Sequence, residues 1–352
     1  MKVLALNSSS RIKGQSKTEL LLSHLVAGMR NAGAEVEVVE LRKKKINYCR
    51  GCFTCWTKTP GVCVHKDDMS LELFPKWLEA DIAVYASPLY HYTVNAQMKA
   101  FIERTLPSLL PYLERKDDIT FHPRRGKHPT AVIVSVAAFP EDSVFDAISF
   151  WAKKTFGRRT GLLAEIYRPG SEAMIHSWKL KDILDAVEQA GRELVEQRCV
   201  TNETMARITQ PLVDPAVIAA TSNVMWQTLI DGRLTIAEAT KQGHAPRPDS
   251  ITTLMAMLSF AFNPLNAGDK KGTIQFNFTG KQPGSCYFVI DKDSCAAHEG
   301  KAEKAKCTVD GPFEVWADII QGKSDAAKMF MDGTCKAEGD MALMMVFGGA
   351  EA

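Results

Sequence analysis

The chain has 352 residues, of which 45% are hydrophobic and 24% charged, and its formal net charge is +2. This length predicts two domains, and the near-neutral charge gives no sign of a nucleic-acid partner. The first apolar run, Val3 to Leu6, is too short for a signal peptide, and no stretch approaches the roughly 18 apolar residues of a membrane span. We therefore expect a cytoplasmic protein with no transmembrane segment.

Residues 1–200 alternate short apolar runs with amphipathic stretches. The runs predict buried strands over 3–6, 36–39, 82–86, 131–136 and 163–166, and helical spacing between them predicts helices over 20–29, 69–78, 98–106, 145–151 and 183–194. Strands that alternate with helices indicate βαβ units and a parallel sheet. We predict an α/β fold, a flavodoxin-like doubly wound five-stranded parallel sheet with a ligand site where the first and third strands diverge.

The pattern changes after residue 200. Residues 201–244 are mostly helical but interrupted by prolines, which predicts a helical connector or an arm that wraps a partner subunit. From residue 245 a helix precedes an alternating strand through Ile274, Phe276 and Phe278, then a meander and further helices. Strands followed by helices are typical of α+β folds. The predicted domains are thus 1–200, the connector 201–244, and a smaller α+β domain over 245–352.

A polar loop, Ser8 to Thr18, follows the first strand and opens the first helix. Free N–H groups and the helix dipole meet at such a turn, which suits a phosphate. The loop has neither the Walker A nor the G-x-G-x-x-G pattern, which disfavours tightly bound ATP or NAD. A plain capped helix start remains the alternative. The loop after the third strand, Ser87 to Tyr92, offers aromatic and prolyl side chains that can stack on a planar ring, and the small apolar loop around Ala137 and Ala138 can close over it.

The phosphate loop, Ser87-Pro88-Leu89-Tyr90 and the segment Asn95 to Phe101 resemble NAD(P)H-dependent FMN reductases and, more closely, iron–sulfur flavoproteins. The resemblance covers about residues 1–200 and implies bound FMN. It implies that the FMN phosphate is held by Ser9, Arg11, Ser16 and Thr18. Lys17, which lies between Ser16 and Thr18 in the sequence, is included in the candidate site. It also implies that the isoalloxazine ring is lined by Pro88, Leu89, Tyr90 and His91.

Four cysteines, Cys49, Cys52, Cys55 and Cys63, form the pattern C-x2-C-x2-C-x7-C. Four thiolates at short spacing suit a 4Fe–4S cluster, although structural zinc and four reduced thiols without a metal stay open as alternatives. The resemblance to iron–sulfur flavoproteins favours iron. Because the motif follows the second strand, we expect it at the sheet edge that carries the phosphate loop, close to the flavin. The remaining cysteines are expected to be packing residues: Cys199, Cys286, Cys295, Cys307 and Cys335.

Several segments beyond residue 245 resemble sterol carrier protein type 2 domains: Leu265 to Gly268, Thr273 to Thr279, His298 to Ala302, Phe330 to Gly333 and Lys336 to Met341. The resemblance implies a five-stranded sheet with helices around an apolar tunnel that binds a lipid, sterol or other hydrophobic molecule. An apolar last helix over 341–347 could line that tunnel or simply pack in a core.

Together these features predict an FMN-dependent oxidoreductase with no catalytic side chain of its own, because the flavin performs the chemistry. Electrons would come from NAD(P)H or a ferredoxin-like carrier and pass through FMN and an iron–sulfur cluster to a small or hydrophobic acceptor such as a quinone. The alternative is a lipid- or sterol-binding or sensing protein in which the flavin state gates the C-terminal pocket. In a third interpretation the C-terminal domain mainly drives assembly. We expect a homodimer or homotetramer.

Overall fold

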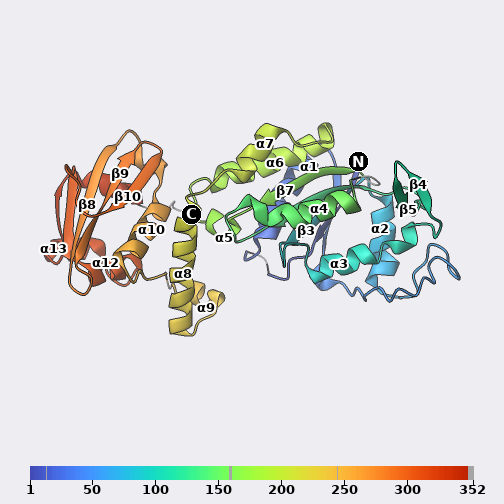
Figure 1. Ribbon diagram of the computed structural model, residues 1–352, viewed down its shortest axis with the longest axis horizontal. Helices are drawn as coiled ribbons and strands as arrows, with labels where there is room; N and C mark the ends of the chain where they lie inside the picture. The colour runs from blue at the N-terminus through green and yellow to red at the C-terminus, as the bar shows by residue number, and fades with distance from the viewer. Residues whose placement is uncertain (13, 158–160, 244, 348–352) are drawn as a thin grey trace. The chain divides into compact units, whose positions relative to one another are not determined.

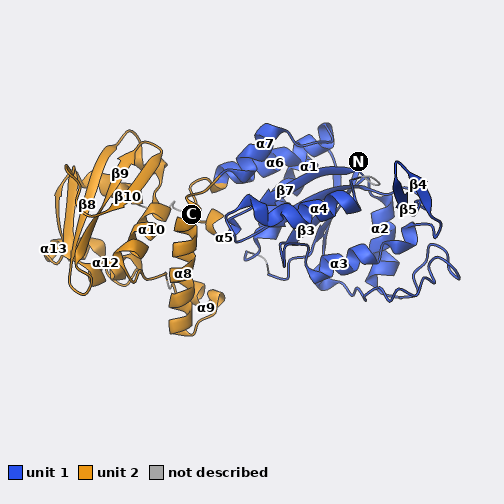
Figure 2. Cartoon of the chain, in the orientation of Figure 1, with its two compact units in different colours: residues 1–172, 181–210 blue, residues 173–180, 211–352 orange. Residues whose placement is uncertain are grey.

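The computed structural model describes residues 1–352 except 13, 158–160, 244 and 348–352, and it divides into two compact units (Figures 1 and 2). Unit 1 comprises residues 1–172 and 181–210, and unit 2 comprises residues 173–180 and 211–352. The segment predicted as a connector is helical. Its first helix, α7 (Asn202–Thr209), lies in unit 1, whereas α8 (Pro215–Gly232) and α9 (Ile236–Lys241) lie in unit 2.

Unit 1 is built on a five-stranded parallel sheet in the order β2-β1-β3-β6-β7. The strands are β1 (Lys2–Asn7), β2 (Glu35–Glu40), β3 (Ile82–Pro88), β6 (Thr130–Val136) and β7 (Leu162–Arg168). The central strands β3 and β6 are buried along almost their whole length, as expected for strands covered on both faces. The predicted flavodoxin-like doubly wound sheet is confirmed.

Helices cover both faces of this sheet (Figure 1). One core cluster joins the sheet to α2 (Phe74–Glu79), α3 (Ala96–Glu103) and α4 (Asp146–Thr155). On the other face, α1 (Lys17–Asn31) packs against α6 (Leu180–Glu196). The two backbones meet at glycines, because a Cβ at Gly28 would collide with the carbonyl oxygen of Glu188, and one at Gly191 with that of Leu25.

A short hairpin interrupts the alternation between α3 and β6, and the sequence analysis did not anticipate it. Its strands are β4 (Glu114–Lys116) and β5 (Ile119–Phe121), and the turn residues Asp117 and Asp118 have φ of 51° and 58°. Aspartate tolerates this left-handed region better than most residues. The hairpin leads into His122, whose ring lies 4.6 Å from that of Trp56 in the cysteine segment.

Unit 2 has its own five-stranded sheet in the order β10-β9-β8-β11-β12. The strands are β8 (Lys271–Thr279), β9 (Gly284–Asp291), β10 (Ser294–Glu299), β11 (Cys307–Pro312) and β12 (Lys336–Gly339), and all neighbouring pairs are antiparallel except β8 with β11. The sheet packs with helices α10 (Ile251–Ala261) and α12 (Phe313–Ile320). Besides α8 and α9, unit 2 also contains α11 (Pro264–Ala267), α13 (Ala326–Met331) and the 3-10 turn η5 (Met341–Phe347). The predicted α+β domain is confirmed.

Aromatic rings fill the core of unit 2. Phe276 is fully buried, and its ring contacts those of Phe278, Phe288 and Trp316 at centroid distances of 5.3 to 6.0 Å. The segment over 341–347, expected as a helix, buries Leu343 and Val346 against the same core. The apolar tunnel that the sterol-carrier resemblance implies stays a prediction.

We predict that Gly28→Ala destabilises unit 1, because its methyl group has no room between α1 and α6. Overpacking of this kind costs about 1–3 kcal/mol. Denaturant unfolding of the full chain, followed by circular dichroism, measures the loss. Gly126→Ala is the matched control, because a Cβ at this exposed glycine meets no heavy atom within 4 Å. Equal midpoints for both variants would contradict the close helix contact.

Candidate functional site

The phosphate loop joins β1 to the N-terminus of α1 and is organised by its own hydroxyl groups. Ser16 caps α1: its Oγ accepts the Glu19 N–H at 3.0 Å and donates to Ser9 Oγ at 2.8 Å. Because Ser9 accepts this bond, its own hydroxyl proton remains available to a ligand. Ser9, Ser16 and Thr18 are all buried, so the predicted phosphate hydroxyls are held in place.

Two cations flank this loop and converge on one carboxylate. Arg11 Nη1 pairs with Glu172 Oε1, and Lys17 Nζ lies 3.4 Å from Glu172 Oε2. Glu172 belongs to the short helix α5 (Ser171–Met174), just after β7. The carboxylate shows that an anion can be held here by both cations. The sequence analysis missed Glu172, because nothing near it in the chain marks it as a partner of the loop.

The loop after β3 contains two residues in a strained backbone conformation. His91 and Tyr92 have φ of 46° and 63°, and Tyr90 and Thr93 exchange N–H to O bonds of 3.0 and 3.1 Å across them. The left-handed region is uncommon for residues other than glycine and is often found at functional sites. The turn leaves the side chains of Tyr90 and Tyr92 about half exposed. This loop can therefore present an aromatic face to a ligand.

Hydrogen bonds join the three loops at the carboxyl edge of the sheet. Asn95 Nδ2 donates to Ser8 O at 2.6 Å, which links the β3 loop to the phosphate loop. Leu89 N–H bonds to Val136 O at 3.0 Å, and Ser171 N–H bonds to Ala137 O at 2.8 Å. Ala137 is buried and Ala138 exposed. The structure thus brings the loops that carry the predicted FMN residues to one place.

The arrangement fits FMN. A helix N-terminus with buried hydroxyls and two cations suits the phosphate. Half-exposed aromatic side chains on the neighbouring loop suit a planar ring.

The four motif cysteines line one hollow, which is partly open to solvent. Cys55 is buried, Cys49 and Cys63 are half-buried, and Cys52 is exposed. Within the described residues, no three His, Cys, Asp or Glu side chains are positioned to hold one metal ion as they stand. The donor set therefore fits a four-thiolate centre in chemistry and in location, but the ligand shell is not preformed.

The thiols in this hollow differ in acidity. A hydrogen bond from Thr54 Oγ1 to Cys52 Sγ at 3.4 Å lowers the pKa of Cys52. Burial raises the pKa of Cys55, and the neighbouring thiols Cys63, Cys49 and Cys52 raise it further. Cys52 is therefore more readily deprotonated than Cys55, and the thiolate is the form of cysteine that binds metals. The effect on Cys55 also indicates that the four sulfurs lie near one another.

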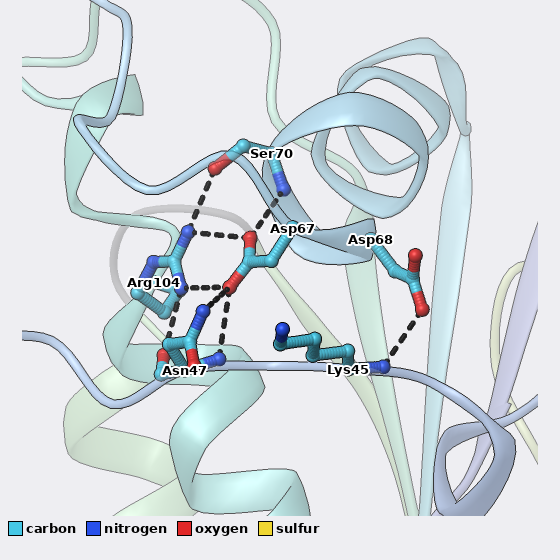
Figure 3. Close-up of polar contacts among 6 residues, drawn as sticks. All are labelled: Lys45, Asn47, Asp67, Asp68, Ser70 and Arg104. Carbon is cyan, nitrogen blue, oxygen red and sulfur yellow. Dashed lines mark hydrogen bonds and ion pairs between the residues drawn. The ribbon is translucent and has the colours of Figure 1, made fainter.

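A buried ion pair closes the cysteine segment (Figure 3). Arg104 Nη1 and Nη2 lie 2.8 and 2.9 Å from the two Asp67 oxygens, and both side chains have 1% or less of their surface exposed. Asp67 Oδ2 also accepts Asn47 N–H at 2.8 Å, and Lys45 N–H bonds to Asp68 Oδ2 at 2.7 Å. The two ends of the segment that contains all four cysteines are thus tied together. Sequence reasoning missed this pair.

Several groups act on the pKa of Asp67. Burial alone would raise it, but hydrogen bonds from Arg104, Asn47 and Ser70 hold it far below its usual range. The carboxylate therefore stays charged beside the guanidinium at neutral pH.

The position of the hollow differs from the expected one. Its lining includes Glu103, Arg104, Leu106 and Pro107, at the C-terminal end of α3. The N-terminal end of α3, at Asn95, is the end that contacts the phosphate loop. With eight residues in α3, the two places are separated by about 12 Å along the helix. The cysteines thus lie one helix length from the sheet edge where we expected them, because the chain runs back across the molecule after β2.

All nine cysteines are free thiols. Cys286, Cys307 and Cys335 are buried in the core of unit 2, and Cys295 is packed against it, in agreement with the expected packing role. Cys199 is exposed, so the expectation that it packs in a core is wrong.

Two family models match the chain. Residues 1–127 match the NADPH-dependent FMN reductase family, and residues 267–350 match the SCP-2 sterol transfer family. The chain joins an FMN reductase domain to an SCP-2 domain. The fusion expected from the sequence is therefore confirmed.

The FMN reductase domain is similar to curated iron–sulfur flavoproteins. One from Archaeoglobus fulgidus is 44% identical over 107 residues, which cover 30% of this chain and 46% of the relative. One from Methanocaldococcus jannaschii is 34% identical over 104 residues, which cover 30% of this chain and 50% of the relative. The chain spans about half the length of the curated relatives it matches.

Solved structures overlap this domain at low identity. An NAD(P)H:quinone oxidoreductase from Methanothermobacter marburgensis has a TM-score of 0.40 at 17% identity and covers 55% of this chain and 96% of its own. An FMN-dependent NADH-azoreductase from Bacillus anthracis, solved with FMN, has a TM-score of 0.41 at 13% identity and covers 55% of this chain and 99% of its own.

Across the part of the chain that the structure describes, every helix is too short or too polar to cross a bilayer.

We predict that Ser9→Ala weakens FMN binding about 10- to 100-fold, because a hydrogen bond to a charged group contributes about 1.5–3 kcal/mol. Ser9 is a better test than Ser16, whose hydroxyl also caps α1. The dissociation constant is measured by titrating the FMN-free protein and following flavin fluorescence.

The matched control is Ser23→Ala, which removes an exposed hydroxyl from α1, the helix that follows the phosphate loop. It should leave the dissociation constant unchanged. An unchanged affinity in folded Ser9→Ala protein would contradict the phosphate assignment.

Proposed function

We propose that this protein is an FMN-dependent oxidoreductase that takes electrons from NAD(P)H or a small electron carrier. The observation that carries the proposal is the meeting of three loops at one sheet edge, where buried hydroxyls and two cations lie beside half-exposed aromatic side chains. The match of this domain to NADPH-dependent FMN reductases supports it. FMN, when bound, supplies hydride and single-electron chemistry, so no protein side chain is needed as a catalyst.

The chain's own residues would bind and orient the cofactor. The phosphate would be held by the loop and helix start of α1, through Ser9, Arg11, Ser16, Lys17 and Thr18. The ring would lie against the β3 loop and be bordered by the β6 loop, through Pro88, Leu89, Tyr90, His91, Ala137 and Ala138. Glu172 must release Arg11 or Lys17 when the phosphate arrives, because a carboxylate and a phosphate compete for the same cations.

We further propose that Cys49, Cys52, Cys55 and Cys63 hold a 4Fe–4S cluster. Four thiols around one hollow supply the ligand number that such a cluster takes. The names of the similar curated proteins support iron over zinc. A cluster at this position would supply one-electron transfer at the far end of α3 from the flavin loops.

The SCP-2 domain supports a hydrophobic acceptor such as a quinone, or a bound lipid. The same match favours a second candidate function, a lipid- or sterol-binding protein gated by the flavin. A homodimer or homotetramer stays a proposal. So does the cytoplasmic location, which nine free cysteines support, because disulfides are rare in reducing compartments.

Anaerobic reconstitution tests the cluster. We expect about four irons and four sulfides per chain, and loss of both in Cys52→Ala. Cys199→Ala is the matched control, because Cys199 is an exposed thiol outside the motif. One zinc per chain, or no metal uptake by fully reduced thiols, would contradict the proposal.

Mixing the FMN-loaded full chain with NADH or NADPH under anaerobic conditions tests the oxidoreductase. We expect the flavin absorbance to bleach rapidly and to recover on addition of a quinone. A flavin that neither nucleotide nor a reduced ferredoxin reduces would contradict this function. A lipid that co-purifies and whose affinity changes with the flavin redox state would favour the second candidate.

A further inference from the structure

Arg104 donates four of its five N–H groups to Asn47, Asp67 and Ser70. We call these four residues the Arg104 clamp (Figure 3). Nη1 donates to Asn47 O at 2.7 Å and to Asp67 Oδ2 at 2.8 Å, and Nη2 donates to Asp67 Oδ1 at 2.9 Å and to Ser70 Oγ at 2.7 Å. A guanidinium has five N–H groups in one plane. The hydrogen bonds of the clamp therefore use all four N–H groups of the two terminal nitrogens, and only Nε–H is not used.

The fifth donor, Nε–H, is buried and has no hydrogen-bond partner. Leaving a buried donor unpaired is costly, so a native structure that does so calls for an explanation. The same side chain lines the hollow that contains the four cysteines. His65, also in that lining, has a buried Nε2 without a partner. Two buried polar atoms without a hydrogen-bond partner therefore belong to residues that line this hollow, where a ligand with acceptor atoms could satisfy them.

Cys63 and Arg104 line the same hollow. Burial alone would lower the pKa of Arg104, but Asp67 and the charge at Cys63 raise it on balance. The guanidinium therefore keeps its charge at neutral pH, in the lining that it shares with the four thiols.

We propose that Arg104 is a positioning residue of the four-cysteine site, held by Asp67 so that its charge and its free Nε–H face the sulfurs of the bound cluster. This inference rests on the iron–sulfur site proposed above. The sulfurs of such a cluster carry negative charge, and hydrogen bonds to them and nearby charge set its reduction potential. A fixed positive charge stabilises the reduced form, which is the more negative one.

The clamp explains why an arginine suits this position. Its planar fork binds the Asp67 carboxylate through two nitrogens, and the third nitrogen then points in a fixed direction. Lysine would keep the charge but could not hold Asp67 and donate to a sulfur in one rigid plane. Asp67 in turn is bonded to Asn47 and Ser70, so the guanidinium is fixed relative to both ends of the cysteine segment.

The test compares wild type, Arg104→Gln, Arg104→Lys and Arg115→Gln after anaerobic reconstitution. Arg115 is the matched control, because it is an exposed arginine paired only with Asp118 in the described contacts. Circular dichroism and FMN content report folding, and iron content reports loading. The decisive readout is the midpoint potential of the cluster from an EPR-monitored redox titration.

We expect the wild type and Arg115→Gln to share one potential. Arg104→Gln should shift it to a more negative value, and Arg104→Lys should shift it less. A folded Arg104→Gln protein with wild-type potential and EPR spectrum would overturn the inference and leave Arg104 a purely structural role. If Arg104→Gln does not fold, Arg104→Lys decides by the same criterion, and failure of both to fold would also overturn it. A wild type that takes up no iron would instead refute the iron–sulfur site itself.

Discussion

Helix α3 is fixed at both ends by buried polar side chains, and both candidate sites depend on it. At its start, Asn95 caps the helix, because its Oδ1 accepts a backbone N–H of the first turn. The backbone N–H of Asn95 donates to Ser87 Oγ, and its Nδ2 donates to Ser8 O. At its end, Arg104 binds Asp67 and so closes the cysteine segment. One eight-residue helix therefore sets the spacing between the loops that we propose hold the flavin and the four thiols.

The two ends of α3 also differ in the kind of charge they favour. The phosphate loop gathers the cations Arg11 and Lys17 beside a helix N-terminus, where an anion is stabilised by both the charges and the dipole. At the other end, Arg50 and Arg104 line the hollow with four thiols, which would become negative on binding a metal. The phosphate loop thus favours an anion, whereas four thiolates would favour a metal cation, although the chain as a whole is nearly neutral. Placement of a few buried or half-buried groups matters here more than overall composition.

Much of this could be predicted from local sequence. Continuous apolar runs such as Val3 to Leu6 and Ala131 to Val136 identify buried parallel strands, and the rule that ligands bind at the carboxyl edge places their loops together. The cysteine spacing identifies the thiol site directly. The partners Arg104 and Asp67 could not be predicted, because they are 37 residues apart and each resembles an ordinary surface charge. The same holds for Glu172, which meets Arg11 because the helix after β7 reaches the phosphate loop, although two strands separate β7 from β1. The position of the thiols could not be predicted either, because no local pattern shows how far a loop runs back along the sheet.

The central claim is that the flavin loops and the four-cysteine site form one electron-transfer unit despite their separation along α3. The most direct measurement is EPR of the anaerobically reconstituted full chain after addition of NADPH, made with FMN present and with FMN removed. The account predicts that the signal of a reduced cluster develops only when FMN is bound. A reconstituted cluster that stays oxidised while bound FMN is fully reduced, or one that NADPH reduces equally well without FMN, would contradict it.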